Sequence, residues 1–153
     1  MAKNKKLTPR RMAREWAMQF LFQNDVRNSD LEDEDLQLFW DQLRNSPSSP
    51  KKERDFEQAS AFAEELIRGV LANKSEIDEF LKKFSTNWPV ERMSVTDRNI
   101  LRIGAFEILH SELAPQIIIN EAVEISKAFG VADSPKFINA ILDNITKDCG
   151  KGA

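Results

Sequence analysis

The sequence is poor in the residues that build the commonest metal, redox and phosphate-loop sites. It has one cysteine, Cys149, and one histidine, His110, among 153 residues. A single cysteine excludes an internal disulfide framework and a cysteine-rich zinc site, and it favours a reducing, cytoplasmic setting. Five glycines leave little room for glycine-rich phosphate loops or for the tight hairpins of an all-β fold.

Long apolar runs are also missing. The longest, Ile117 to Ile119, is far shorter than the ~18 residues that a membrane span needs. The basic N-terminal segment has no apolar core behind it, so it does not have the pattern of a secretory signal. With 41% hydrophobic and 31% charged residues, the chain has the composition of a soluble globular protein, and its length fits one domain.

Charge is distributed unevenly along the chain. Residues 1–14 hold six basic side chains and no acid, a charge of +6, whereas the other 139 residues hold 16 basic and 25 acidic ones, a charge of −9. The total of −3 excludes a globally basic nucleic-acid binder. A basic segment on an acidic body indicates either an anionic partner or a solvated terminus, and charge alone favours neither.

The spacing of apolar residues predicts an all-α fold of about seven helices. Apolar residues recur at i, i+3, i+4 and i+7, which places them on one face of a helix. The predicted helices lie near residues 10–22, 24–43, 56–72, 75–84, 95–112, 117–129 and 134–145, with a Pro/Ser linker at 45–52. We expect a flexible basic arm at 1–9, a single helical domain at 10–148 and a disordered tail at 149–153.

Residues at the predicted helix ends support these boundaries. Ser94, with Asp97 three residues later, resembles a capping box, and Gly130 stands where a helix C-terminus often has glycine. Ser134 before a proline is a good N-cap. Gly104 in mid-helix costs roughly 1 kcal/mol against alanine, so we expect another helix to approach it closely.

Catalytic motifs are absent. The sequence contains no GxxxxGK[ST], GxGxxG, HExxH or GxSxG pattern, so we expect neither an enzyme nor a cofactor. His110 stands near a helix end, where we expect it to interact with the C-terminal carbonyls. Cys149 is interpreted as an incidental thiol near the chain end.

Two basic clusters are candidates for phosphate binding. Arg10, Arg11 and Arg14 lie within about 100° of one another beside an apolar stripe and predict one cationic edge. Lys136 and Phe137 begin the last predicted helix, whose N-terminal N–H groups attract anions. Phe137 could pack in the core or stack on an unpaired base, and core packing is slightly favoured.

Several stretches of the sequence resemble the NusB family. They are RRMAREWAMQFLF at 10–22, Trp88 through DRNILRIGAFEI at 97–108, INEAVEISKAFG at 119–130 and DSPKFINAILD at 133–143. The last two blocks are long and ordered, which makes them specific. The resemblance covers nearly the whole chain and is weakest at 24–57.

This resemblance implies two packed helical bundles and a transcription antitermination factor active on ribosomal RNA operons. Proteins of the family bind the single-stranded boxA element of nascent RNA, pair with NusE, a small-subunit ribosomal protein, and join a complex on RNA polymerase. No catalysis and no cofactor are implied, and both a monomer and a homodimer remain open.

The resemblance also assigns RNA-binding residues. With two lysines of the basic arm added, they are Lys5, Lys6, Arg10, Arg11, Arg14, Phe22, Asp133, Ser134, Lys136 and Phe137. Asn120 and Glu121 stand out in the same motif, and we interpret them as a helix N-cap and a first-turn acid. The surface for NusE is expected on the helices at 77–112.

Other interpretations are weighed beside this one. The acidic body is compatible with a helical protein–protein adaptor that does not bind RNA. The RNA-binding module of an RNA cytosine methyltransferase is disfavoured, because no glycine-rich α/β half follows the last helix. The charge of residues 24–43, seven acids and one base, suggests that the segment 24–57 folds onto the RNA face and inhibits binding.

Overall fold

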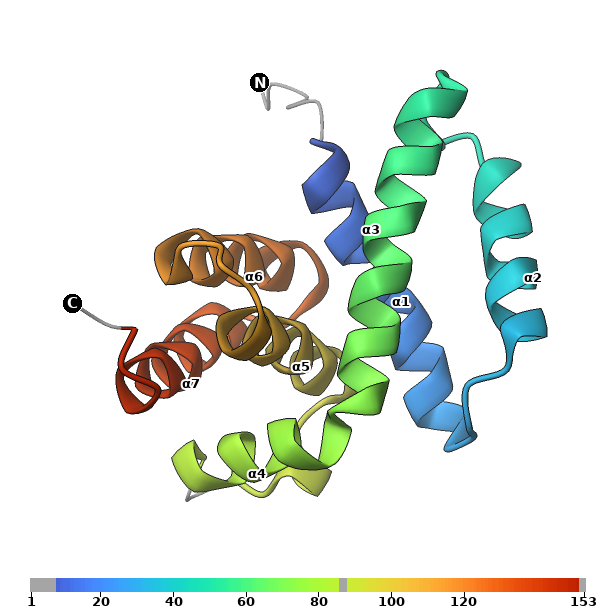
Figure 1. The fold of residues 1–153 in the computed structure, drawn as a ribbon. Coiled ribbons are helices and arrows are strands. Elements are labelled where there is room, and N and C mark those ends of the chain that lie inside the picture. The colour runs from blue at the N-terminus through green and yellow to red at the C-terminus, as the bar shows by residue number, and fades with distance from the viewer. Residues whose placement is uncertain (1–7, 86–87, 152–153) are drawn as a thin grey trace.

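The structure, a computed structural model, describes residues 8–85 and 88–151 and is built from α-helices (Figure 1). They are α1 (Pro9–Arg27), α2 (Asp33–Arg44), α3 (Glu53–Ala72), α4 (Lys74–Phe84), α5 (Val95–His110), α6 (Pro115–Phe129) and α7 (Ser134–Asp148). A short 3-10 turn, η1 (Val90–Arg92), precedes α5. The prediction of an all-α fold with about seven helices is confirmed.

The helices form two packed bundles around one continuous core. The N-terminal bundle consists of α1, α2 and α3, and the C-terminal bundle consists of α4, α5, α6 and α7. Helix α5 contacts α4, α6 and α7 of its own bundle and also α1 and α3 of the other. It is therefore the central helix of the molecule, and the apolar core passes through it from one bundle to the other.

Side-chain caps begin two of the helices, and one of them is the cap predicted at Ser94. Thr8 caps α1, with its Oγ1 accepting from the Arg11 N–H at 3.1 Å, and Ser94 caps α5, accepting from the Asp97 N–H at 3.0 Å. Gly104 of α5 lies directly against α7, where an added Cβ would sit 2.7 Å from Leu142 Cδ1. The close helix contact predicted at this glycine is thus confirmed.

Several helix boundaries differ from the prediction. Helix α1 continues past residue 22 to Arg27 and ends where Asn28 adopts the left-handed conformation, with φ 51°. Asparagine tolerates this conformation better than most residues. The acidic stretch at 24–43 is therefore the end of α1, a loop and α2. At α7, Asp133 is the N-cap and Ser134 is already the first helical residue.

The C-terminal residues up to Lys151 are a helix cap rather than a disordered tail. Gly150 has a φ of 76°, and its N–H donates to the Lys147 carbonyl at 3.2 Å. The Lys151 N–H donates to the Thr146 carbonyl at 3.0 Å, which completes a Schellman motif. Cys149 is partly buried and packs against the core, so it does not lie in a frayed end.

Lys151 also takes the role expected of His110. Its ammonium donates to the Ile108 and Ser111 carbonyls at the end of α5. The His110 Nε2 instead lies 3.1 Å from a carboxylate oxygen of Glu76 on α4. The histidine therefore faces the neighbouring helix, and the lysine beyond α7 satisfies the carbonyls.

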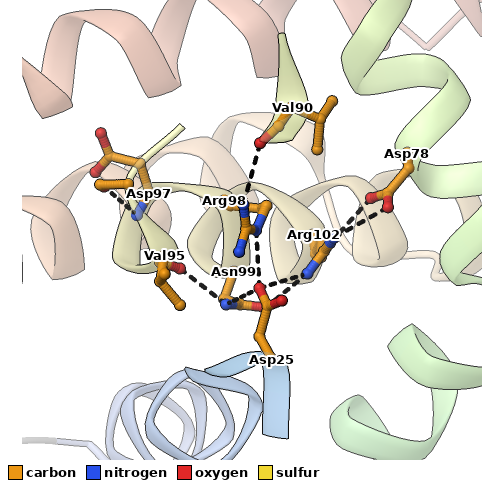
Figure 2. Close-up of polar contacts among 9 residues, drawn as sticks. Asp25, Asp78, Val90, Val95, Asp97, Arg98, Asn99 and Arg102 are labelled. Atoms are coloured by element: carbon orange, nitrogen blue, oxygen red, sulfur yellow. Dashed lines mark hydrogen bonds and ion pairs between the residues drawn. The ribbon is translucent and has the colours of Figure 1, made fainter. Parts of the chain in front are cut away.

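A polar cluster joins the end of α1 to α4 and α5 (Figure 2). Asp25 Oδ2 accepts from Arg98 Nε at 2.8 Å, Asn99 Nδ2 at 3.0 Å and Arg102 Nη1 at 2.9 Å. Arg102 also donates twice to Asp78, at 2.9 and 3.0 Å. Burial opposes ionisation of Asp25, but hydrogen bonds from Arg98 and Asn99 and the charges of both arginines lower its pKa.

We predict that Asp25→Asn lowers the free energy of unfolding by about 2–3 kcal/mol at pH 7, because two mostly buried arginines lose a charged acceptor. The pKa of Asp25 is lower in the folded than in the unfolded chain. Its contribution is therefore complete above about pH 4 and is lost as the pH falls through the folded pKa.

Urea unfolding between pH 3 and pH 8 measures this difference. Asp41→Asn, which removes the same charge from an exposed position on α2, is the matched control and should change stability by less than about 0.5 kcal/mol. An Asp25→Asn effect that stayed constant down to pH 3 would contradict the prediction.

Candidate functional site

The first turns of α1 carry the three predicted arginines, and the structure gives each a different environment. Arg10 is exposed, and its guanidinium lies 4.8 Å from the centre of the Phe62 ring on α3. This cation–π contact holds the side chain over an aromatic face while its donors remain in solvent. Arg10 is therefore free to bind an anion.

Arg11 already forms one ion pair within the protein. Its Nε donates to Glu121 Oε2 on α6, and the two side chains are 30% and 15% exposed. The pair links the N-terminal bundle to the C-terminal bundle at the surface. Arg11 can meet a phosphate only if its bond with Glu121 rearranges.

Arg14 is not part of an exposed cationic edge, and this part of the prediction is wrong. Its side chain is 3% exposed and donates to both carboxylate oxygens of Glu107 on α5, at 2.7 and 2.8 Å. Its Nη1 also lies 3.6 Å from Glu121 Oε1. Burial lowers the pKa of Arg14, but its hydrogen bonds with Glu107 and the charges of Glu107 and Glu121 raise the pKa by more than that. The net shift of the Arg14 pKa is therefore upward.

The prediction that Glu121 is a first-turn acid is wrong. Helix α6 begins at Pro115, so Asn120 and Glu121 lie in its second turn and Asn120 is not an N-cap. The Asn120 side chain accepts from Gln116 at 2.9 Å, whereas Glu121 pairs with Arg11 and Arg14. The sequence carries no signal for this pairing, because 107 residues or more separate the partners.

The second predicted cluster surrounds the start of α7. Asp133 and Lys136 are exposed, and Phe137 is partly buried against the core. Ser134 is buried: its hydroxyl donates to Asp97 at 3.1 Å and accepts from the Val131 N–H at 3.0 Å. The hydrogen-bonding groups of the Ser134 hydroxyl are thus used inside the protein, which favours a structural role over contact with a ligand.

Both clusters border α6. The first reaches it at Glu121, and the second lies beside Gly130, where an added Cβ would sit 2.7 Å from Ser134 Oγ. Nine residues of α-helix separate these points, about 14 Å along the axis. Phe22, the aromatic candidate on α1, is 39% exposed. Lys5 and Lys6 lie outside the described residues.

The acidic helix α2 does not cover this surface, contrary to the expectation of an inhibitory segment. Phe39 packs against Phe20 of α1 with ring centres 5.3 Å apart, and Trp40 donates to Glu64 of α3 at 3.1 Å. These contacts place α2 on one side of α1 and α3, whereas α6 lies on the other side (Figure 1).

Glu15 adds a further acid to the arginine cluster. It lies one turn after Arg11 on α1 and is half-buried. Burial raises the pKa of Glu15, the positive charge of Arg11 lowers it, and the negative charge of Glu121 raises it again, with a net upward shift. The folded protein thus holds two carboxylates around one partly exposed arginine.

Metal binding and membrane insertion find no support in the described residues. They contain no group of three His, Cys, Asp or Glu side chains that could hold a metal ion. No helix within residues 8–85 and 88–151 is long and apolar enough to cross a bilayer. The surface instead presents the hydrogen-bond donors of arginine and lysine side chains and the rings of phenylalanines.

Comparisons with known proteins show which family this chain resembles. Residues 11–147 match the family model described as NusB family. The chain is 41% identical over 143 residues to the transcription antitermination protein NusB of Desulfitobacterium hafniense (strain DSM 10664 / DCB-2), which covers 93% of this chain and 90% of that protein. It is 38% identical to the protein of the same name from Syntrophotalea carbinolica, over 92% and 93% of the two chains.

Solved structures share the fold. The structure of T. maritima NusB aligns with a TM-score of 0.75 at 33% identity, over 94% of each chain. A chain from a complex of the antitermination factors NusB and NusE with dsRNA aligns with a TM-score of 0.72 at 24% identity, over 94% of this chain and 99% of that one. At that identity, the second match supports the fold alone.

We predict that Glu15→Gln raises the melting temperature at pH 7 by about 1–2 °C. The folded state binds the Glu15 proton more tightly than the unfolded chain, so the charged form destabilises the fold above the raised pKa. The gain should vanish below about pH 4, where the wild-type carboxyl is protonated in both states. Calorimetry at both pH values measures this, with the exposed Glu57→Gln as control. A lower melting temperature at pH 7 would contradict it.

Proposed function

The chain belongs to the NusB family, and we propose that it is a transcription antitermination factor that binds boxA-type single-stranded RNA together with NusE. The observation that carries this proposal is the match over residues 11–147, joined to 38–41% identity with antitermination proteins over nearly the whole chain. In this proposal the protein works in the cytoplasm, as part of a complex on RNA polymerase, without catalysis and without a cofactor.

The basic and aromatic groups along α1 and at the start of α7 support RNA as the ligand. Arg10 and Arg11 present forked donors that fit phosphate oxygens. Lys136 adds a charge beside the α7 N-terminus, with Asp133 preceding it. The rings of Phe22 and Phe137 can stack on unpaired bases, as in other readers of single-stranded RNA.

The predicted RNA-binding residues thus fall into three groups in this proposal. Arg10, Arg11, Phe22, Asp133, Lys136 and Phe137 contact RNA, and Lys5 and Lys6 add contacts from the basic arm at 1–9. Arg14 and Ser134 act from the interior, where they hold α1 and α7 against α5. The proposed NusE surface lies on α4 and α5, within residues 77–112.

A second candidate function is a protein–protein adaptor that does not bind RNA. The observation that favours it is the neutralisation of the cationic edge, since Glu107 and Glu121 pair with two of its three arginines. The RNA-binding measurement described next separates the two functions.

We predict that the double variant Arg10→Ala/Arg11→Ala binds boxA-type RNA roughly tenfold more weakly at physiological salt. Its plot of log affinity against log salt should be flatter by about 1.4, because each lost phosphate contact on a single strand removes about 0.7. Fluorescence anisotropy in a salt series, with and without NusE, measures both quantities. Arg14→Ala is unsuitable here, because it leaves the buried Glu107 carboxylate without its main partner and destabilises the fold.

The double variant Arg27→Ala/Arg44→Ala is the matched control, since it removes two exposed arginines from outside the proposed RNA and NusE surfaces. It should leave affinity and slope nearly unchanged, and a scrambled RNA should bind more weakly than the boxA-type RNA. NusE binding without any RNA binding by the wild-type protein would favour the adaptor.

A further inference from the structure

Glu121 occupies an unusual position among the arginines of α1. One carboxylate oxygen accepts from Arg11 Nε, and the other lies 3.6 Å from Arg14 Nη1. A single acid of α6 thus spans two arginines from successive turns of another helix. Its side chain is 15% exposed, so water reaches one side of the group.

The two arginines depend on Glu121 to different degrees. Arg14 is held by both oxygens of Glu107 and keeps that buried pair if Glu121 moves. Within the described residues, the ion pair of Arg11 is with Glu121, and the Arg11 side chain is 30% exposed. Arg11 is therefore the partner that can exchange, while Arg14 keeps α1 in place.

A carboxylate and a phosphate compete for the same donors. The guanidinium fork binds either group through parallel N–H bonds, so one arginine fork can make its full contact with only one of them at a time. A partly exposed ion pair contributes little net free energy, and a phosphate can displace it. Glu121 remains close afterwards and repels the phosphate that took its place.

We infer that Glu121 is a positioning residue that competes with RNA phosphate for Arg11 and thereby sets the affinity of this surface for RNA. This inference rests on the proposed function. In the free protein Glu121 holds Arg11 against α6, ready for a ligand. In the complex the fork turns to the phosphate, and the repulsion from Glu121 keeps binding weaker than the arginines alone would allow.

The variant Glu121→Gln tests this, because it keeps the size of the side chain and removes its charge. We expect boxA-type RNA to bind about threefold more tightly, with a steeper salt slope, because the charge of Glu121 no longer repels the phosphate that Arg11 binds. Glu124→Gln is the matched control: it removes the same charge one turn further along α6, where Glu124 pairs with Lys127. It should have a clearly smaller effect on both quantities.

A double-mutant cycle with Arg11→Ala isolates the pair. If Glu121 acts through Arg11, Glu121→Gln in the Arg11→Ala background should change affinity no more than Glu124→Gln does. Thermal unfolding of each variant verifies the fold. Should Glu121→Gln not fold, Glu121→Asp retains the charge on a shorter side chain and should give a smaller gain in affinity.

The outcomes distinguish this inference from the proposed function. Equal effects of Glu121→Gln and Glu124→Gln, or a gain that persists without Arg11, would overturn the inference. RNA binding that needs Arg10 and Arg11 but does not respond to Glu121→Gln would overturn the inference and leave the proposed function intact. Absence of RNA binding by the wild-type protein would overturn both.

Discussion

Charged and polar side chains buried on the central helix α5 are the constraint on which the arrangement of the other helices depends. A buried charge is costly unless a partner satisfies it, so each such group on α5 requires a particular group on a neighbouring helix. The pairs are Glu107 with Arg14, Arg102 with Asp25 and Asp78, Asn99 with Asp25, and Asp97 with Ser134. They tie α5 to α1, α4 and α7. Apolar packing supplies the core, and these contacts add specific pairings between the helices.

This constraint explains why α1 has both structural and surface functions within two turns. Arg14 faces α5 and forms a buried ion pair with Glu107, whereas Arg10 faces solvent over the Phe62 ring. Arg11 lies between them and shares Glu121 with Arg14. One helix therefore anchors the two bundles and presents donors to a ligand. The buried ion pair fixes the backbone from which the exposed arginines project, which limits the conformational freedom that ligand binding would have to remove.

The sequence predicted correctly the structural features that depend on residues close together in the chain. Helical spacing, the cap at Ser94 and the glycine at 104 predicted elements that the structure contains, because these features depend on residues within a few turns. The predictions failed where the environment of a residue depends on a partner far away in the sequence. Arg14 and Ser134 belong to residue types that are usually exposed, and contacts with α5 and other segments bury them. Helix α1 extends beyond its predicted end to Arg27, and Asp25 in this extension contacts Arg98 and Arg102, more than 70 residues away.

By itself, the sequence determined the helical class, the number of helices, the uneven charge and the resemblance to one family, since periodicity, composition and motif order are properties of the chain alone. Only the tertiary structure decided which arginines are free, that Glu121 stands between two of them, and that the acidic α2 lies away from α6 (Figure 1). The physical reason is that burial and ion pairing depend on which helices meet. A helical periodicity shows that one face is covered, and it does not show by which residues.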